Sequence, residues 1–150
     1  MNPIMEDADD HPMDRVNLFM LAFGQKVPSK PTMPEPDVQS LRFRLIHEEA
    51  EELHDADNLI EYLDAVGDLL YVVYGAALAA GFTARQMDAA VAEIHRSNMS
   101  KLWTKDELAS APADHKIEPA WGGLFIVSRS DGKIIKSPSY SPANLKPIIE

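Results

Sequence analysis

The stretch LRFRLIHEEAEEL, residues 41–53, decides how the chain can fold. Five of its side chains fall on or beside one stripe of a helical projection: Leu41, Leu45, Glu48, Glu49 and Glu52. The stripe begins apolar, as in a helix that packs on a core, and becomes acidic halfway along. Because ionised carboxylates facing a low-dielectric interior are costly unless paired, we expect something positive to lie there.

A second helix, expected over residues 59–80, repeats this pattern. Glu61, Asp64 and Asp68 share one of its faces, directly before the run LLYVVYGAALAA of residues 69–80, which is apolar on every side. A helix tolerates such a run in water only when neighbours surround it, so we expect this helix at the centre of the domain. Two acidic faces then point at one interior.

The remaining sequence predicts an all-α fold of about four helices. A first helix is expected from Asp14, as its N-cap, to about Phe23, and a fourth from Arg85 to about Ser100, with Thr83 as N-cap. The helix that contains residues 41–53 should begin near residue 36 and end near residue 56. Four prolines make residues 24–36 an extended connector.

Beyond Lys101 the pattern changes. The string GGLFIVSRSDGKIIKS, residues 122–137, has two β-prone runs around Ser130, Asp131 and Gly132, which predicts a small β-hairpin. Three prolines in residues 137–150 predict an extended tail on the surface. We therefore expect a flexible acidic arm over residues 1–13, an all-α core over 14–101, and a hairpin and tail over 102–150 that close the site.

Composition narrows the classes of function. The formal charge of −10 argues against a broad nucleic-acid footprint, which needs clustered Lys and Arg. Cysteine is absent from the sequence, so disulfides and thiolate metal sites are excluded and a cytoplasmic location is the default. The first residues do not read as a secretory signal, and the apolar run of residues 69–80 is shorter than the roughly 20 residues that span a membrane.

The acidic faces have the chemistry of a metal site. Many hard oxygen ligands, without a second histidine at metal-ligand spacing from His47 or His95, favour Mg²⁺, with Mn²⁺ as a substitute. Basic partners in the two helices are few, namely Arg42 and Arg44. The string EEAEE alone would equally describe a solvated helix face, but its convergence with Asp64 and Asp68 favours a cation site. We interpret both histidines as structural or exposed.

Three strings carry a resemblance to a known family: EEAEEL (residues 48–53), DAVGDLLYVVYG (64–75) and EIHRSNMSK (93–101). They resemble the MazG-like branch of the all-α NTP pyrophosphatases, including its phage and bacterial dUTPase- or dGTPase-type members. The family signature is EExxE on one helix and ExxD on the next. The resemblance implies a four-helix MazG-like bundle, and it assigns metal binding and water activation to Glu48, Glu49 and Glu52.

The second part of the signature departs from the family. Aligning GDLLYV on the family's GDLL puts Asp68 on its aspartate but Ala65 where its glutamate belongs. Asp64 is the stand-in, since an i, i+4 pair shares a helical face much as an i, i+3 pair does. A literal ExxD also exists at Glu61 and Asp64, so two registers stay open.

Substrate contacts are expected from the later segments. Asn98 and Lys101 continue the stripe of Val91 and Ile94, and the resemblance implies contacts to the triphosphate or sugar, although a polar helix end would look the same. The string SDGKIIKSPSYSP, residues 130–142, resembles a closing element of many family members. That element would offer three further side chains to the substrate: Lys133 and Lys136 to phosphates, and Tyr140 to stack or pack.

The resemblance implies a Mg²⁺-dependent enzyme that converts a nucleoside triphosphate to the monophosphate and pyrophosphate, with Glu48 or Glu49 accepting a proton from water. The substrate would be a deoxynucleotide, with dUTP, dCTP and dGTP all open. Because the helix of residues 59–80 is apolar all round, we expect a homodimer or homotetramer. Two rivals remain: the related phosphoribosyl-ATP pyrophosphohydrolase, and a noncatalytic helical module whose acidic faces bind a basic partner.

Overall fold

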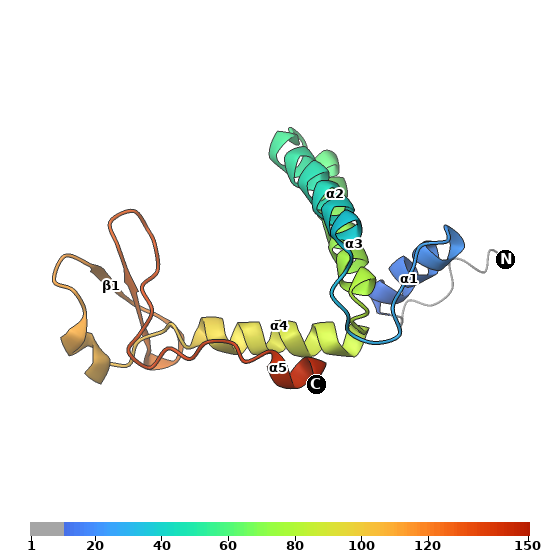
Figure 1. The fold of residues 1–150 in the computed structure, drawn as a ribbon. Helices are drawn as coiled ribbons and strands as arrows, with labels where there is room; N and C mark the ends of the chain where they lie inside the picture. Colours follow the sequence, from blue (N-terminus) through green and yellow to red (C-terminus); the bar gives the residue numbers. More distant parts are fainter. Residues whose placement is uncertain (1–10) are drawn as a thin grey trace. The chain divides into compact units, whose positions relative to one another are not determined.

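The computed structural model describes residues 11–150, so the expected acidic arm lies outside the described residues except for its last three. The chain divides into two compact units, Met1–Met87 and Asp88–Glu150. Figure 1 shows the succession of elements along the chain, and each unit is described below by itself.

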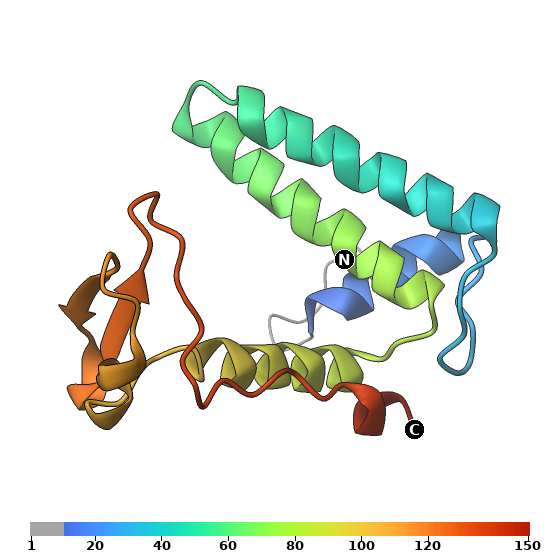
Figure 2. The same ribbon diagram turned by 60° about the vertical axis from the view of Figure 1, so that its left-hand side comes forward.

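The first unit is built on an antiparallel pair of helices. α2 (Pro36–Asp55) and α3 (Leu59–Ala79) pack side by side along their length, joined by a turn over residues 56–58 (Figure 2). Asn58 caps α3, because its Oδ1 accepts hydrogen bonds from the backbone N–H of Ile60 at 3.1 Å and of Glu61 at 3.0 Å. Both helices begin and end within one residue of the predicted boundaries.

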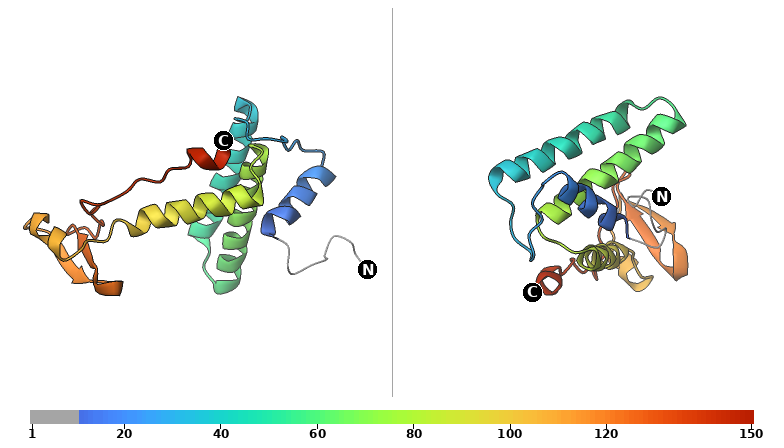
Figure 3. Two further views of the ribbon diagram at one scale, coloured as in Figure 1. Left: turned by 90° about the horizontal axis from the view of Figure 1, so that it is seen from below. Right: turned by 90° about the vertical axis from the view of Figure 1, so that its right-hand side faces the viewer.

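α1 (Pro12–Ala22) packs across the C-terminal half of α3 (Figure 3). Six buried residues from the two helices form the core of this unit: Met13, Val16, Met20, Ala77, Leu78 and Ala79. The predicted N-cap Asp14 is wrong, since His11 Nδ1 accepts from the Met13 N–H at 3.1 Å. The helix starts earlier because Pro12, with its fixed φ and no N–H, suits a first helical turn.

An extended connector and a tight turn complete the first unit. Residues 24–35 hold no helix, as expected, and the connector is tied to the end of α3 by the Thr32 N–H, 2.9 Å from the Ala80 carbonyl. Thr83 Oγ1 then accepts from the Gln86 N–H at 3.1 Å, and Gln86 Oε1 accepts from the Thr83 N–H at 3.0 Å. This capping box confirms Thr83 as the start of α4 (Ala84–Met99).

α4 begins in the first unit and ends in the second. With α1, α2 and α3 it confirms a mostly helical fold with four long helices, while the MazG-like bundle itself stays a prediction. Two 3₁₀ helices, η1 (Asp106–Ser110) and η2 (Trp121–Gly123), and the short α5 (Lys146–Ile149) lie in the second unit.

A small antiparallel hairpin in the second unit is confirmed, but its strands differ from those expected. β1 (Lys116–Pro119) pairs with β2 (Phe125–Ser128) across the η2 turn. The expected turn at residues 130–132 does reverse the chain, yet the segment after it adds only an isolated bridge between Ser128 and Ile134. The pairing stops there because Ser137 Oγ donates to the Ser100 carbonyl at 2.7 Å and Pro138 has no N–H to donate.

The tail runs back along α4, as the views of the second unit show (Figure 1). Hydrogen bonds hold it there: the Ser141 N–H donates to Ser100 Oγ at 2.9 Å, Arg96 Nη2 donates to the Pro142 carbonyl at 3.1 Å, and the Asn144 N–H donates to Glu93 Oε1 at 2.9 Å. The hydrogen bonds from Arg96 and Asn144 lower the pKa of Glu93 to about 2. The extended tail is therefore confirmed, and polar contacts make up its seam with α4.

α3 is only partly enclosed within the chain. Four residues form its outer stripe: Leu59, Leu63, Val66 and Leu70. The three leucines are exposed, Leu59 at 87%, Leu63 at 74% and Leu70 at 53%. Taken as a whole, α3 is also the one helix within residues 11–150 that is long and apolar enough to cross a membrane. Core helices of soluble proteins meet the same criterion of length and composition. One chain therefore does not cover α3 completely, and its coverage by a partner subunit stays a prediction.

Candidate functional site

The acidic stretch of α2 places its three glutamates differently. Glu49 lies on the face of α2 that turns inward with Arg42 and Leu45, and it is half-buried, whereas Glu48 and Glu52 are exposed. Glu49 Oε2 is fully buried and has no hydrogen-bond partner among residues 11–150. An orphaned carboxylate oxygen in a half-buried position is costly, so Glu49 marks the centre of the candidate site.

Carboxylates from both helices act on Glu49. Burial raises its pKa first, and nearby negative charges raise it further. These charges belong, in decreasing order of effect, to Glu52, Asp68, Glu48 and Asp64. The five predicted metal-site residues therefore form one electrostatic group across the α2–α3 pair, which we call the acidic cluster.

The two registers left open on α3 differ in their contacts. The charges of Asp64 and Asp68 both act on Glu49. Glu61 uses its carboxylate to close the turn before α3, where Glu61 Oε2 accepts from the Asp57 N–H at 3.3 Å. Ala65, at the position of the family glutamate, is buried, with 3% of its surface exposed.

The acidic cluster fits a hard cation by its donor set. All of its donors are carboxylate oxygens, the kind of ligand that Mg²⁺ prefers, and one of them is buried without a partner. However, no three acidic or histidine groups within residues 11–150 are already close enough together to hold a metal ion. The side chains would have to draw together for a cation to be bound.

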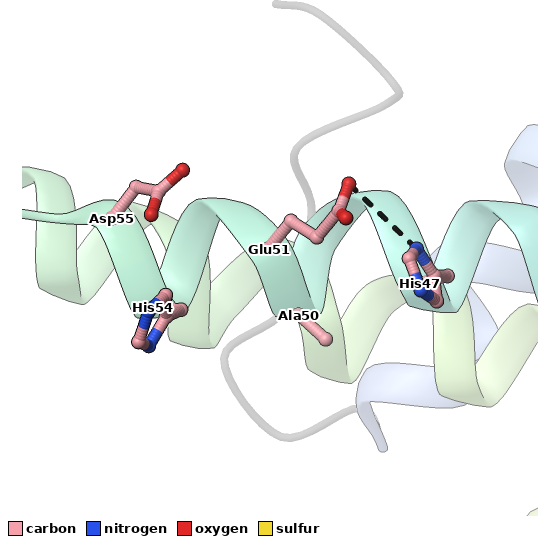
Figure 4. A pocket seen from close by; sticks show the side chains of 5 residues that line it. All are labelled: His47, Ala50, Glu51, His54 and Asp55. Atoms are coloured by element: carbon pink, nitrogen blue, oxygen red, sulfur yellow. Dashed lines mark ion pairs between the residues drawn. The ribbon is translucent and has the colours of Figure 1, made fainter.

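The opposite face of α2 carries a surface pocket that is separate from the acidic cluster. Five residues line it: His47, Ala50, Glu51, His54 and Asp55 (Figure 4). His47 Nδ1 lies 3.7 Å from Glu51 Oε2, and both side chains are exposed. Glu49 is two positions from each of them, which turns it about 200° away on the helix. His47 and His95 are both exposed, in agreement with their interpretation as structural or exposed residues.

The predicted substrate-contacting residues lie in the second unit. Lys101 Nζ donates to Asn98 Oδ1 at 2.8 Å at the end of α4. Lys136 Nζ lies 4.4 Å from the centre of the Tyr140 ring, a cation–π geometry. Lys133 lies in the exposed turn after β2, where its N–H donates to Asp131 Oδ1 at 3.1 Å.

Two residues that act on Tyr140, Ser97 and Arg96, were not predicted from the sequence. Ser97 Oγ donates to the Tyr140 hydroxyl at 3.4 Å, and this bond, followed by the charges of Lys136, Lys101 and Arg96, lowers the pKa of Tyr140. Ser97 is buried at the end of α4, a position where a polar residue needs a partner. Positive charge is therefore gathered around one phenol in a chain that is acidic overall.

Comparisons with known proteins support the resemblance in the motifs at the level of the superfamily, and its dUTPase- or dGTPase-type branch stays a prediction. The family model described as phosphoribosyl-ATP pyrophosphohydrolase matches residues 16–98, more than half of the chain, and this stretch contains α2, α3 and nearly all of α4. The chain is also similar to uncharacterized protein L479 of Acanthamoeba polyphaga mimivirus, with 58% identity over 43 residues. That match covers 27% of this chain and 17% of the viral protein, so the chain spans only a small part of that relative.

Proposed function

We propose a function for this chain, which belongs to the phosphoribosyl-ATP pyrophosphohydrolase family within the MazG-like all-α NTP pyrophosphohydrolase superfamily. The chain hydrolyses a nucleoside triphosphate to the monophosphate and pyrophosphate, and its substrate is a deoxynucleotide. Membership indicates a nucleotide pyrophosphohydrolase. The observation that carries the proposal is Glu49, a half-buried carboxylate with an orphaned oxygen among four further carboxylates from two helices.

We propose that Mg²⁺, or Mn²⁺ in its place, is held by Glu48, Glu49, Glu52, Asp64 and Asp68. A bound cation would supply charge screening and polarise the α-phosphoryl group. The protein needs it for binding as well, because a triphosphate carries about four negative charges and the chain itself has a formal charge of −10. The orphaned Oε2 of Glu49 supports this assignment.

The protein's own carboxylates would handle the proton. Water attacks the α-phosphorus, the bond from that phosphorus to the bridging oxygen of the β-phosphate breaks, and pyrophosphate leaves with the bonding electrons. The proton of the water passes to Glu48 or Glu49. The raised pKa of Glu49 supports it in this role, since a general base works best when its pKa approaches the operating pH.

On α3 we propose the register in which Asp64 and Asp68 are the ligands. The action of both charges on Glu49 supports it, and so does the hydrogen bond that occupies Glu61 at the turn. Asp64 would then take the part that a glutamate at position 65 takes in the family motif. Buried Ala65 has no side chain that could serve.

In the second unit we propose that Asn98, Lys101, Lys136 and Tyr140 contact the phosphates or sugar, with Lys133 as an outer contact. The positive charges of Lys101 and Lys136 near the Tyr140 hydroxyl support this, because anionic phosphates bind where cationic donors converge. We also propose that the chain works as a homodimer or homotetramer, which the exposed outer stripe of α3 supports.

Two other functions give different results in one experiment. Phosphoribosyl-ATP itself is favoured as a substrate by the description of the matching family. The purified chain should be incubated with dUTP, dCTP, dGTP and phosphoribosyl-ATP, with Mg²⁺ or with EDTA, and the products identified. Pyrophosphate and a deoxynucleoside monophosphate, formed only with Mg²⁺, are expected. Cleavage of phosphoribosyl-ATP alone would favour the first rival, and no turnover would favour a noncatalytic acidic module.

A further inference from the structure

A cavity of about 250 Å³ lies between α1, α2 and α3 in the first unit. Its wall is mostly apolar, and it includes the rings of Phe19 and Tyr71, which meet edge to face with centres 5.8 Å apart. Two polar side chains, Arg42 and Gln25, also line it. The cavity has the volume of roughly eight water molecules in the liquid, which is room for a flat heterocycle.

Arg42 places a cation in this cavity, and no carboxylate among residues 11–150 forms an ion pair with it. Its Nη2 donates to Gln25 Oε1 at 3.0 Å, while its Nε is buried with no hydrogen-bond partner. Burial lowers the pKa of Arg42, so the surroundings disfavour its charge. A partly buried guanidinium with unused N–H groups is costly until an acceptor meets them.

The backbone makes room for this guanidinium. A Cβ placed on Gly75 of α3 would lie 2.8 Å from Arg42 Nη1, so any side chain there would displace the head group. Glycine in the middle of a helix is unfavourable by roughly 0.5–1 kcal/mol relative to alanine. Gly75 thus leaves room for the guanidinium of Arg42 beside α3 at the cavity wall.

The cavity has a fixed relation to the acidic cluster. Arg42 and Glu49 are seven residues apart on one face of α2, which is about 10 Å along the helix axis. A nucleotide with its phosphates at Glu49 would carry its base toward Arg42. The two sites are therefore spaced as the two ends of one ligand would require.

We propose that this cavity is the nucleobase pocket and that Arg42 selects a base with two adjacent acceptors, as guanine has in O6 and N7. The proposal rests on the proposed function for the placement of the phosphates. An arginine fork pairs well with that acceptor pair, whereas adenine and cytosine present an amino group that would meet the donors of Arg42. Phe19 and Tyr71 supply apolar and aromatic surface for the ring.

The test measures binding of nucleoside monophosphates to the full chain by calorimetry, so that no turnover is required. dGMP and dIMP, which both keep O6 and N7, should bind alike. 7-deaza-dGMP lacks N7, and dAMP has an amino donor at C6 where guanine has an acceptor, so each should bind about tenfold more weakly than dGMP. Equal binding of all four ligands, or of none, would overturn the proposal.

Variants separate recognition by Arg42 from a structural role. R42M and R42K should each bring dGMP binding down to the level of dAMP, because neither side chain has the fork of donors. R44M, on the same helix and exposed, is the matched control and should keep the guanine preference. If R42M or R42K is folded by circular dichroism and keeps the preference, the proposal is overturned.

Failure of this inference can be told apart from failure of the proposed function. Guanine-selective binding without pyrophosphate release from dGTP would contradict the proposed function and support the pocket. Pyrophosphate release at equal rates from all four common dNTPs, unchanged in R42M, would contradict the pocket and support the function.

Discussion

A single side chain, Glu49, distinguishes the candidate site from an ordinary acidic helix face. Glu48 and Glu52 are exposed and can be solvated, but Glu49 is half-buried and has an oxygen with no partner. Its pKa is raised by burial and by the carboxylates on both helices. The sequence named all three glutamates as equals, since their spacing alone does not tell which one turns inward.

Replacing Glu49 by glutamine tests its role directly. E49Q should lower turnover of a cleaved dNTP by at least about 100-fold, because it removes both a proton acceptor and a cation ligand while keeping the shape of the side chain. E51Q, on the outer face of α2 beside His47, is the matched control and should change turnover little. Steady-state rates with Mg²⁺ decide, and an E49Q enzyme as active as E51Q would remove Glu49 from the site.

The same variant has a signature in stability. Because the pKa of Glu49 is raised in the folded state, its contribution to stability is fully present below its ordinary value of 4.5 and is lost as the pH rises through the raised pKa. Without divalent cation, E49Q should therefore gain in stability over the natural chain between mildly acid and neutral pH. Urea unfolding of both proteins measures this, and added Mg²⁺ should narrow the difference.

Asp64 is the residue at which the chain departs from the family motif. D64N should depress turnover by about 100-fold and weaken Mg²⁺ binding, whereas E61Q should have a mild effect, since Glu61 is engaged at the turn before α3. Metal titrations and rates on both variants separate the registers. Equal damage from E61Q and D64N, with a mild D68N, would favour the Glu61–Asp64 pair instead.

Among the helices, α3 depends on one glycine just beyond its C-terminal end. Gly81 has φ of +75°, and a Cβ there would lie 2.3 Å from the carbonyl oxygen of Lys30 in the connector. G81A should lower the free energy of unfolding by more than about 1 kcal/mol, because both the backbone and the connector must shift. Gly67, in mid-helix with nothing within 4 Å of its Cβ position, is the control.

Substitution of Gly67 should change the free energy of unfolding in the opposite direction. G67A should raise the free energy of unfolding by roughly 0.5–1 kcal/mol, since alanine loses less backbone entropy in a helix. Chemical denaturation of the two variants beside the natural chain checks both signs. A G81A protein as stable as G67A would show that the connector does not pack on the end of α3 as described.

Helices were predictable as elements because their signals are local. Asn58, Thr83 and the helical period of the apolar residues lie within a few positions of the boundaries they set. The N-cap of α1 was predicted three residues too late, at Asp14 instead of His11, because Pro12 and Asp14 are competing start signals within one turn. The hairpin was assigned to the wrong pair of strands because the partner of β2 depends on contacts of Ser137 with Ser100, which lie far apart in sequence.

For the molecule as a whole, the exposed outer stripe of α3 predicts that the chain forms an oligomer. Leu59, Leu63 and Leu70 are exposed at the spacing of a helix that packs on another helix. Sedimentation of the natural chain at micromolar concentration should show a dimer or tetramer, and L63E should shift it toward monomer. A50E, on the outer face of α2, is the control. A stable monomer of the natural chain would contradict the prediction.

The candidate site was predictable in its parts and not in its assembly. The residues of the acidic cluster were predicted because carboxylates interrupt an apolar stripe of helical period, which can be recognised from the sequence alone. The contacts of Arg42, Ser97 and Arg96 were not, since each has a partner from another segment: Gln25 for the first, Tyr140 for the second and Pro142 for the third. Long-range polar contacts leave no periodic trace in a sequence.

The seam between the tail and α4 sets an order of events in folding. α2 and α3 are joined by a three-residue turn, so they can pair as soon as both are synthesised. The bonds that hold Ser141, Pro142 and Asn144 join residues 41, 46 and 51 positions apart, and each must close a long loop. After dilution from denaturant, amides within α2 and α3 should therefore become protected from hydrogen exchange before the amide of Asn144 does.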